Sequence, residues 1–264
     1  MTTFGQEIGA GAASLAAGLI NAVAGGGTLF FHAAVLGTFL AASAAPTPLY
    51  RFYQETYALS PVLTTAVFAV YALALLKALL GLMDRTTGSV SLAGQPLQDL
   101  ATFRRAKAGI GYVPQGRGIL PTFTVRENLK LGTFARQSGE ASKYDDLVFE
   151  LFPVLREFLD RRGGNLSGGQ QQQLAIGRAL LTNPKIMLLD EPTEGIQPNI
   201  VEQIEGAIIT LNKRHGITIM LVEQDIGFAR RASDSFIIME KGQVAAGGPV
   251  SELTDELVHG HLAV

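Results

Sequence analysis

Two short segments in the second half of the chain hold residue types that could do chemistry. The first, NLSGGQ at 165–170, places a serine hydroxyl and two glycines directly before a run of helix-forming residues. The first N–H groups of a helix have no partner inside the helix, and the helix dipole favours negative charge there. The backbone of Ser167, Gly168 and Gly169 could therefore bind an anion. Ser167 is also a favourable N-cap, and the two roles are compatible.

The second segment, IMLLDEP at 186–192, is an apolar run that ends in two adjacent acids. Such a run predicts a buried strand, and ligand chemistry in parallel sheets is usually found at the carboxyl ends of the strands. Successive side chains of a strand point to opposite sides, so Asp190 and Glu191 can serve two different tasks.

Strands and helices alternate around these two segments, which predicts a mainly parallel sheet with helices on both faces. We expect a turn at 94–96. The predicted strands are 89–93, 110–114, 186–189, 217–222 and 236–239. The predicted helices are 100–108, 125–131, 144–152, 168–181 and 200–213.

Charge is distributed very unevenly along the 264 residues. Only four of the 44 charged residues lie in the first 80 positions, and positions 8–50 hold none. The net charge of -2 argues against a nucleic-acid-binding surface, so no nucleic-acid partner is expected. The absence of cysteine excludes disulfides and thiolate metal sites.

The uncharged N-terminal part predicts membrane helices, because a bilayer-spanning helix needs about 20 mostly apolar residues. Three spans fit this length: 8–26, 28–45 and 59–82. A buried helical hairpin in a soluble domain is the alternative. We therefore expect a hydrophobic helical segment at 1–76, attached to the membrane, and a separate α/β domain at 77–264.

Four motifs in a fixed order give the α/β part a specific resemblance. They are YVPQGR at 112–117, GGNLSGGQQQQ at 163–173, DEPTEGIQP at 190–198 and LVEQ at 221–224. In this order and spacing, they resemble the ATP-binding subunits of ATP-binding cassette (ABC) importers for branched-chain amino acids and urea. The Gly-Gly pair at 163–164, the four glutamines and EGIQP are more similar to the urea type.

The resemblance implies a partial P-loop NTPase sheet with a helical subdomain, and it implies roles for individual residues. Asp190 would hold Mg²⁺ through water, Glu191 would polarise the attacking water, and Gln224 would be the switch residue. Gln115 would contact the metal-bound water. Ser167, Gly168, Gly169 and Gln170 belong to the signature motif, which would grip ATP bound by a second ATPase subunit.

The family also implies partners and a location. Such subunits work with permease subunits at the bacterial inner membrane, where the ATPase part lies on the cytoplasmic face. The cofactors implied are ATP and Mg²⁺.

One expected motif is missing from the sequence. No G-x-x-x-x-G-K-[ST] occurs among the 264 residues, although this loop (Walker A) cradles the phosphates. By register with the following helix, Ala72 occupies the position of the phosphate-binding lysine and Leu73 that of the Mg²⁺ ligand. Lys77 comes one helical turn too late to replace that lysine. We expect a sheet opened at its centre and little or no ATP hydrolysis by this chain.

The N-terminal residues resemble other transporters instead. AGLINAVAGGGTL at 17–29 is similar to the first helix of sulfite-exporter permeases, and 41–76 is similar to the opening helix pair of major facilitator transporters. Three hypotheses remain open: an importer ATPase whose first part is replaced in a chimeric or misassembled reading frame, a noncatalytic partner that donates its signature motif to an intact ATPase, or a membrane-tethered fragment with the ATPase part unfolded.

Overall fold

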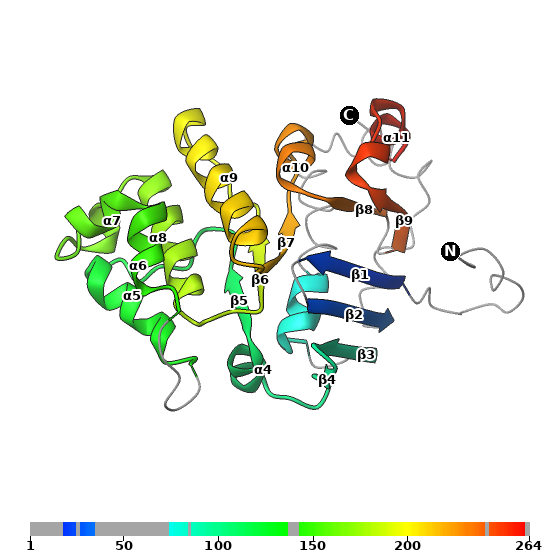
Figure 1. Ribbon diagram of the computed structural model, residues 1–264, viewed down its shortest axis with the longest axis horizontal. Helices are drawn as coiled ribbons and strands as arrows, with labels where there is room; N and C mark the ends of the chain where they lie inside the picture. The colour runs from blue at the N-terminus through cyan, green and yellow to red at the C-terminus, as the bar shows by residue number, and fades with distance from the viewer. Residues whose placement is uncertain are drawn as a thin grey trace, which may run out of the picture.

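In the described residues the strands form three small sheets, and helices pack around the central one (Figure 1). The strands are β1 (Gly18–Ala24), β2 (Gly27–Ala34), β3 (Thr87–Leu92), β4 (Gln95–Pro96), β5 (Ile110–Val113), β6 (Ile186–Asp190), β7 (Thr218–Val222), β8 (Ser235–Glu240) and β9 (Gln243–Pro249). The computed structural model describes residues 18–24, 27–34, 74–83, 86–136, 143–240 and 243–261.

The parallel sheet β5-β6-β7 forms the centre of the molecule. All five residues of β6 are buried, and the four apolar ones alternate between two apolar clusters. Met187 and Leu189 contribute to one cluster, and Ile186 and Leu188 to the other. Burying a side chain of this size contributes about 1.5–3 kcal/mol, so β6 is fixed from both faces.

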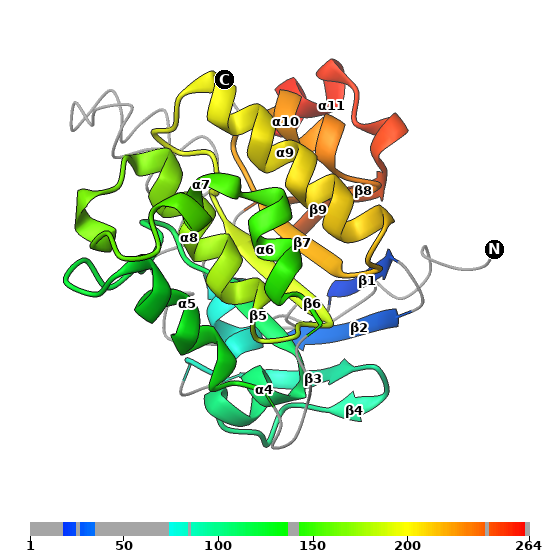
Figure 2. The same cartoon turned by 60° about the vertical axis from the view of Figure 1, so that its left-hand side comes forward.

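Helices cover both faces of this sheet, as the alternation of elements predicts. On one face lie α8 (Gly168–Leu180) and α9 (Pro198–Lys213), whose apolar residues join the cluster of Met187 and Leu189 (Figure 2). On the other face the helical residues 74–80 bring four buried leucines to the cluster of Leu188, namely Leu75, Leu76, Leu79 and Leu80. The chain from residue 74 onward therefore builds a two-sided α/β layer.

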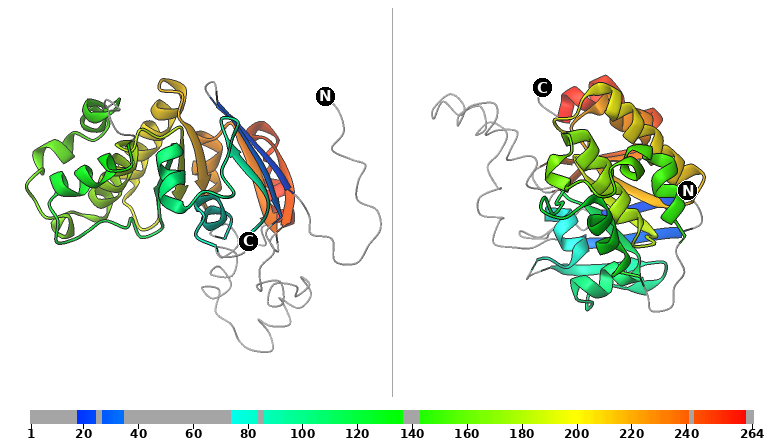
Figure 3. Two further views of the ribbon diagram at one scale, coloured as in Figure 1. Left: turned by 90° about the horizontal axis from the view of Figure 1, so that it is seen from below. Right: turned by 90° about the vertical axis from the view of Figure 1, so that its left-hand side faces the viewer.

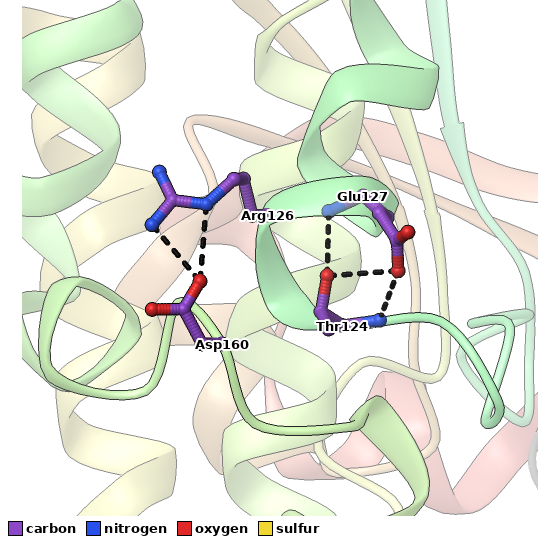
Figure 4. A network of polar contacts seen from close by, with 4 residues as sticks. All are labelled: Thr124, Arg126, Glu127 and Asp160. Atoms are coloured by element: carbon purple, nitrogen blue, oxygen red, sulfur yellow. Dashed lines mark hydrogen bonds and ion pairs between the residues drawn. The ribbon is translucent and has the colours of Figure 1, made fainter.

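A helical subdomain lies at one end of the molecule, with the antiparallel strands at the other (Figure 3). It consists of α5 (Val125–Thr133), α6 (Asp145–Leu151), α7 (Pro153–Glu157) and α8. The α5 and α8 backbones approach closely, since a Cβ at Gly132 would lie 2.1 Å from the Arg178 carbonyl oxygen. A Thr124–Glu127 capping box starts α5, as Figure 4 shows.

The remaining elements complete the two flanks. Helix α4 (Thr102–Ala108) precedes β5, and α10 (Ile226–Ala232) and α11 (Asp255–His261) pack near the β8–β9 hairpin. The 3-10 turns are η1 (Gly163–Asn165) and η2 (Val250–Glu252). Within the described part of the chain, β7 pairs with β6 alone and β8 with β9 alone, so the strands do not form one continuous sheet.

The prediction of membrane helices at 8–26 and 28–45 is wrong for the residues that the structure describes there. Gly18–Ala24 and Gly27–Ala34 form an antiparallel hairpin, and β2 pairs further with β3. An uncharged apolar run fits a buried strand as well as a membrane helix, and pairing with β3 satisfies the β2 backbone. The rest of positions 1–73 lies outside the described residues.

The third predicted span, 59–82, is described only from residue 74, where a short helix runs to residue 80. Among all helices in the described ranges, none combines the length and hydropathy needed to cross a bilayer.

Arg105 joins that short helix to α4. Its side chain is 4% exposed and has four hydrogen bonds to backbone carbonyls. Nη1 donates to Ala78 and Leu79 at 2.9 and 2.8 Å, and Nε and Nη2 donate to Leu100 and Gln98 at 2.9 and 3.0 Å. The Ala78 and Leu79 carbonyls lie in the last turn of the short helix, where a positive charge also complements the helix dipole.

We predict that Arg105→Ala lowers the free energy of unfolding by about 3 kcal/mol, because several buried carbonyls lose a charged donor together. Urea denaturation would measure the loss as a shift of the midpoint at constant slope. The control is Arg126→Ala, which breaks an exposed ion pair with Asp160 (Figure 4). That change should cost less than about 1 kcal/mol. Equal losses in the two variants would contradict the role given to Arg105.

Candidate functional site

The candidate site lies where the three central strands end. Gln115, Glu191 and Gln224 each follow the carboxyl end of one of them, β5, β6 and β7. Because the strands are parallel, all three ends meet at the same edge of the sheet. The sequence could place each residue after a strand, and the structure brings the three together.

Glu191 is the centre of this group. Its side chain is 9% exposed, and its backbone has a φ of 45°, which is uncommon for a residue other than glycine. Gln115 Nε2 donates to Glu191 Oε2 at 2.9 Å, and Gln224 Nε2 donates to Glu191 Oε1. Gln115 Nε2 also donates to Glu194 Oε2 at 3.0 Å. The two predicted glutamines therefore hold the carboxylate proposed as the catalytic group.

Asp190 lies at the end of β6 and is 4% exposed. Its Oδ2 has no hydrogen-bond partner within the described residues. Burial raises the pKa of the Asp190 carboxyl, and the Glu191 and Glu194 charges raise it further. The Gln115 amide and the Lys77 charge lower it. Burial and the Asp190 charge together raise the pKa of Tyr112 to about 12.

The Asp190 environment fits a magnesium ligand. A buried carboxylate oxygen without a partner is costly unless a cation or a donor reaches it. Magnesium is usually held by one or two carboxylates and by substrate phosphates, and a single carboxylate with one free oxygen fits that pattern. Gln115, the other predicted magnesium contact, has its side-chain amide engaged by Glu191 and Glu194.

Glu223 is a site residue that the sequence analysis missed. Its Oε1 accepts hydrogen bonds from the amide and hydroxyl of Thr193 at 3.2 and 2.7 Å. Its Oε2 accepts from the amides of Gln224 and Asp225 at 3.2 and 3.4 Å. Glu223 thus joins the loop after β6 to the turn that carries Gln224. The available signal was its position directly before Gln224.

The signature residues form a separate group at the start of α8. Ser167 and Gln170 make a reciprocal capping box, with Gln170 N to Ser167 Oγ at 3.3 Å and Ser167 N to Gln170 Oε1 at 3.0 Å. A Cβ at Gly169 would lie 2.7 Å from Ile200 Cγ2, so any larger residue would force Ile200 to move. Gly168 and Gly169 are the first two residues of the helix, where amides have no acceptor inside the helix.

Arg117 lies between the Glu191 group and α8. Gly116, Arg117 and Gly118 have φ values of 73°, 72° and 56°. The left-handed region costs a non-glycine residue about 1 kcal/mol or more, so Arg117 is locally strained. A Cβ at Gly168 would lie 3.1 Å from Arg117 Nη2, which places the guanidinium against the signature motif.

The positions predicted to replace the phosphate loop, Ala72 and Leu73, lie outside the described residues. The helix that follows them is described, and it presents Lys77 on an exposed position. Lys77 acts on the Asp190 carboxyl through its charge.

The comparisons with known proteins agree with this geometry. The ABC transporter family matches residues 74–194. The branched-chain amino-acid transport ATP-binding protein BraG of Pseudomonas aeruginosa is 40% identical over 170 residues, which cover 64% of this chain and 72% of BraG. The probable branched-chain amino-acid transport ATP-binding protein LivF of Archaeoglobus fulgidus is 36% identical over 181 residues, covering 69% and 77%.

Solved structures of ATP-binding cassettes are also similar to this chain. The dimeric ATP-binding cassette MJ0796, in a post-hydrolysis state with ADP and Pi, is 29% identical with a TM-score of 0.59. That match covers 67% of this chain and 79% of MJ0796. The fold and the site thus define an ABC-type P-loop NTPase. The chain belongs to the ATP-binding proteins of ABC transporters.

We predict that titration of the Glu223 carboxyl lowers the free energy of unfolding as pH rises. Burial raises the pKa of its carboxyl, with the hydrogen bonds from Thr193, Asp225 and Gln224 opposing this. The native state therefore keeps a proton that the unfolded chain loses first. The free energy of unfolding should decline from about pH 4.3, the ordinary glutamate pKa, up through the raised native pKa.

The measurement is the urea midpoint at a series of pH values. Glu223→Gln should remove this part of the decline, because glutamine does not titrate. Replacing the exposed Glu157 by glutamine serves as the matched control and should leave the decline of the urea midpoint with pH unchanged. A Glu223→Gln profile parallel to the unsubstituted one would refute the assignment.

Proposed function

We propose that this chain is an ATP-binding subunit of an ABC importer for branched-chain amino acids or urea. Its expected partners are a second ATPase subunit and membrane permease subunits, on the cytoplasmic face of a bacterial inner membrane. The observation that carries the proposal is the binding of the Glu191 carboxylate by Gln115 and Gln224 at the end of β6. The similarity to BraG and LivF supports branched-chain amino acids as cargo. The run of glutamines at 170–173 supports urea as the cargo.

Each residue has a role in this proposal. The free Oδ2 of Asp190 would face the magnesium ion, whose charge would neutralise the phosphates of ATP. Glu191 would accept hydrogen bonds from the attacking water, in a site where little bulk water competes. Gln115 and Gln224 orient that carboxylate, and Glu223 fixes the turn that holds Gln224.

The missing phosphate loop limits what the chain could do alone. The loop amides and lysine supply most of the charge neutralisation in phosphoryl transfer. The sequence holds no Gly-Lys pair at any position, and Lys77 is a single cation on an exposed helix face. We therefore propose that residues 77–264 are a truncated ABC ATPase domain that hydrolyses little ATP. We propose further that 1–76, whose strand β2 pairs with β3 of that domain, is of different origin.

A second candidate function follows from the complete signature motif. The capped start of α8, with its glycines and serine, is formed without the phosphate loop. In this family the motif acts on a nucleotide held by the other subunit. The chain could thus complete the site of an intact ATPase without hydrolysing ATP itself.

We predict that the purified full-length chain shows no saturable binding of labelled ATP with Mg²⁺ up to millimolar concentration, because the phosphates lack a cradle. Equilibrium dialysis would measure this, with the Glu191→Gln variant and an intact ATP-binding subunit as comparisons. Micromolar binding would mean that another part of the chain supplies a phosphate site. Hydrolysis above background that is lost in Glu191→Gln would overturn the proposed inactivity.

For the second candidate, we predict that adding this chain to an intact ATP-binding subunit of the same importer increases the ATP retained on gel filtration. Ser167→Arg should abolish the increase, because a long cationic side chain would block the start of α8. The exposed Ser251→Arg is the matched control and should keep it. If the unsubstituted chain gives no increase, the signature motif does not act in trans.

A further inference from the structure

Strand β7 leads into the turn that carries Glu223 and Gln224, and Gln224 binds the Glu191 carboxylate. The strand itself has limited support. In the described part of the chain its backbone is hydrogen-bonded to β6 alone, and only Thr218 among its five residues is buried. The neighbouring β6 is buried throughout. The position of Gln224 therefore depends on the other elements that lie next to β7.

The hairpin β1–β2 is such an element. Its first strand lies close to β7 without pairing with it (Figures 1 and 2). The two strands of the hairpin pair along their whole length, ending with Ala24 opposite Gly27. In the sequence only two glycines, at 25–26, separate the strands. Such a pair suits a two-residue hairpin loop, because these loops need positive φ values.

The second strand of the hairpin is fixed to the rest of the domain. Residues 29–34 of β2 pair with β3. Leu92 of β3 is buried in the cluster of Leu188, and Met220 and Val222 of β7 pack against the same cluster. The hairpin thus joins two strands, β3 and β7, that both contribute to one apolar cluster. A two-stranded hairpin alone is only marginally stable in water, so β3 provides the pairing that the hairpin needs.

We propose that the β1–β2 hairpin is a positioning element of the candidate site. Paired with β3, it holds β1 against β7, and it thereby keeps the turn with Glu223 and Gln224 in place for the contact with Glu191. Residues 18–34, most of which resemble a permease helix in sequence, thus serve the ATPase domain as an intramolecular strand partner. The catalytic use of Gln224 rests on the function proposed above. The support of β7 by the hairpin does not depend on it.

Cross-linking in the full-length chain tests the pairing, because the chain contains no cysteine of its own. Phe30 lies opposite Ser91, and Phe31 lies opposite Val90. Residues directly opposite have Cβ atoms about 4.5–5.5 Å apart, so cysteines introduced at one or both of these pairs should form a disulfide on mild oxidation. Phe30→Cys with Ser89→Cys is the matched control, because a diagonal separation of about 7–8 Å is too long. Mass spectrometry without reductant would measure the yields. No disulfide in either opposed pair, or an equal yield in the control, would overturn the proposal.

Hydrogen exchange tests the support of β7. Phe30→Pro and Phe31→Pro each remove one backbone donor from β2, and successive N–H groups of a strand point to opposite neighbours, so one of the two variants loses a bond to β3. That variant should speed exchange of the β7 amides 219–222 by at least about fivefold. The β5 amides 111–113, on the other side of β6, should exchange as in the unsubstituted chain. Thr47→Pro, which lies outside the hairpin between two natural prolines, is the control and should change neither strand.

The cross-linked chain keeps the proposal testable if the proline variants fail to fold. Its oxidised form should exchange the β7 amides at least about twofold more slowly than its reduced form, with β5 as the internal reference. Equal changes in β5 and β7 would mean general destabilisation and would overturn the proposal, and so would unchanged exchange of β7. No step uses ATP. A failure of the nucleotide-binding predictions would therefore leave this test unaffected, and a failure here would leave those predictions standing.

Discussion

The buried carboxyl end of β6 constrains every loop around it. Two adjacent acids end a strand whose residues are all buried, and a carboxylate in such a place needs donors. Glu191 obtains them from Gln115 and Gln224, which follow the strands on either side. Asp190 receives the Gln115 amide and keeps one oxygen free. The loops after β5 and β7 are therefore positioned by charge as much as by packing.

The same constraint extends to the elements beyond the sheet edge. Glu223 fixes the turn after β7 against Thr193, and Asp225 in that turn caps α10 through a 2.9 Å bond from the Phe228 amide. On the other side, the turn after Gln115 leads through Arg117 to α8. Gln115, Gln224 and the signature motif thus belong to one connected set of contacts.

The edge of β7 is the weaker side of the structure. The side chains of β6 are all buried, whereas four of the five in β7 are only half-buried. Within the described ranges β7 is hydrogen-bonded to β6 alone, β1 lies close to it without pairing, and β8 belongs to a different sheet. Each square ångström of apolar surface that stays in contact with water loses about 25 cal/mol of hydrophobic stabilisation. The total stability of a domain is only about 5–15 kcal/mol.

The sequence by itself determined the motif-bearing elements. It predicted β6, β7 and α8 closely, because apolar runs, an N-cap serine and glycines act locally. It also identified the family and the two glutamines that bind Glu191, but not Glu223. It failed at 18–34, because an uncharged run without a clear period fits a membrane helix and a buried strand equally well. Only pairing with β3 distinguishes the two.

Tertiary structure alone decided which residues touch. Glu223 and Arg117 lie beside predicted residues in sequence, yet their partners, Thr193 and Gln171, are 30 and 54 positions away. Likewise, no local pattern shows that Arg105 binds the carbonyls of Ala78 and Leu79. Local patterns fix strands, caps and turns because these depend on neighbours in the chain. Contacts between loops depend on how the sheet brings its strand ends together, and only the folded chain sets that distance.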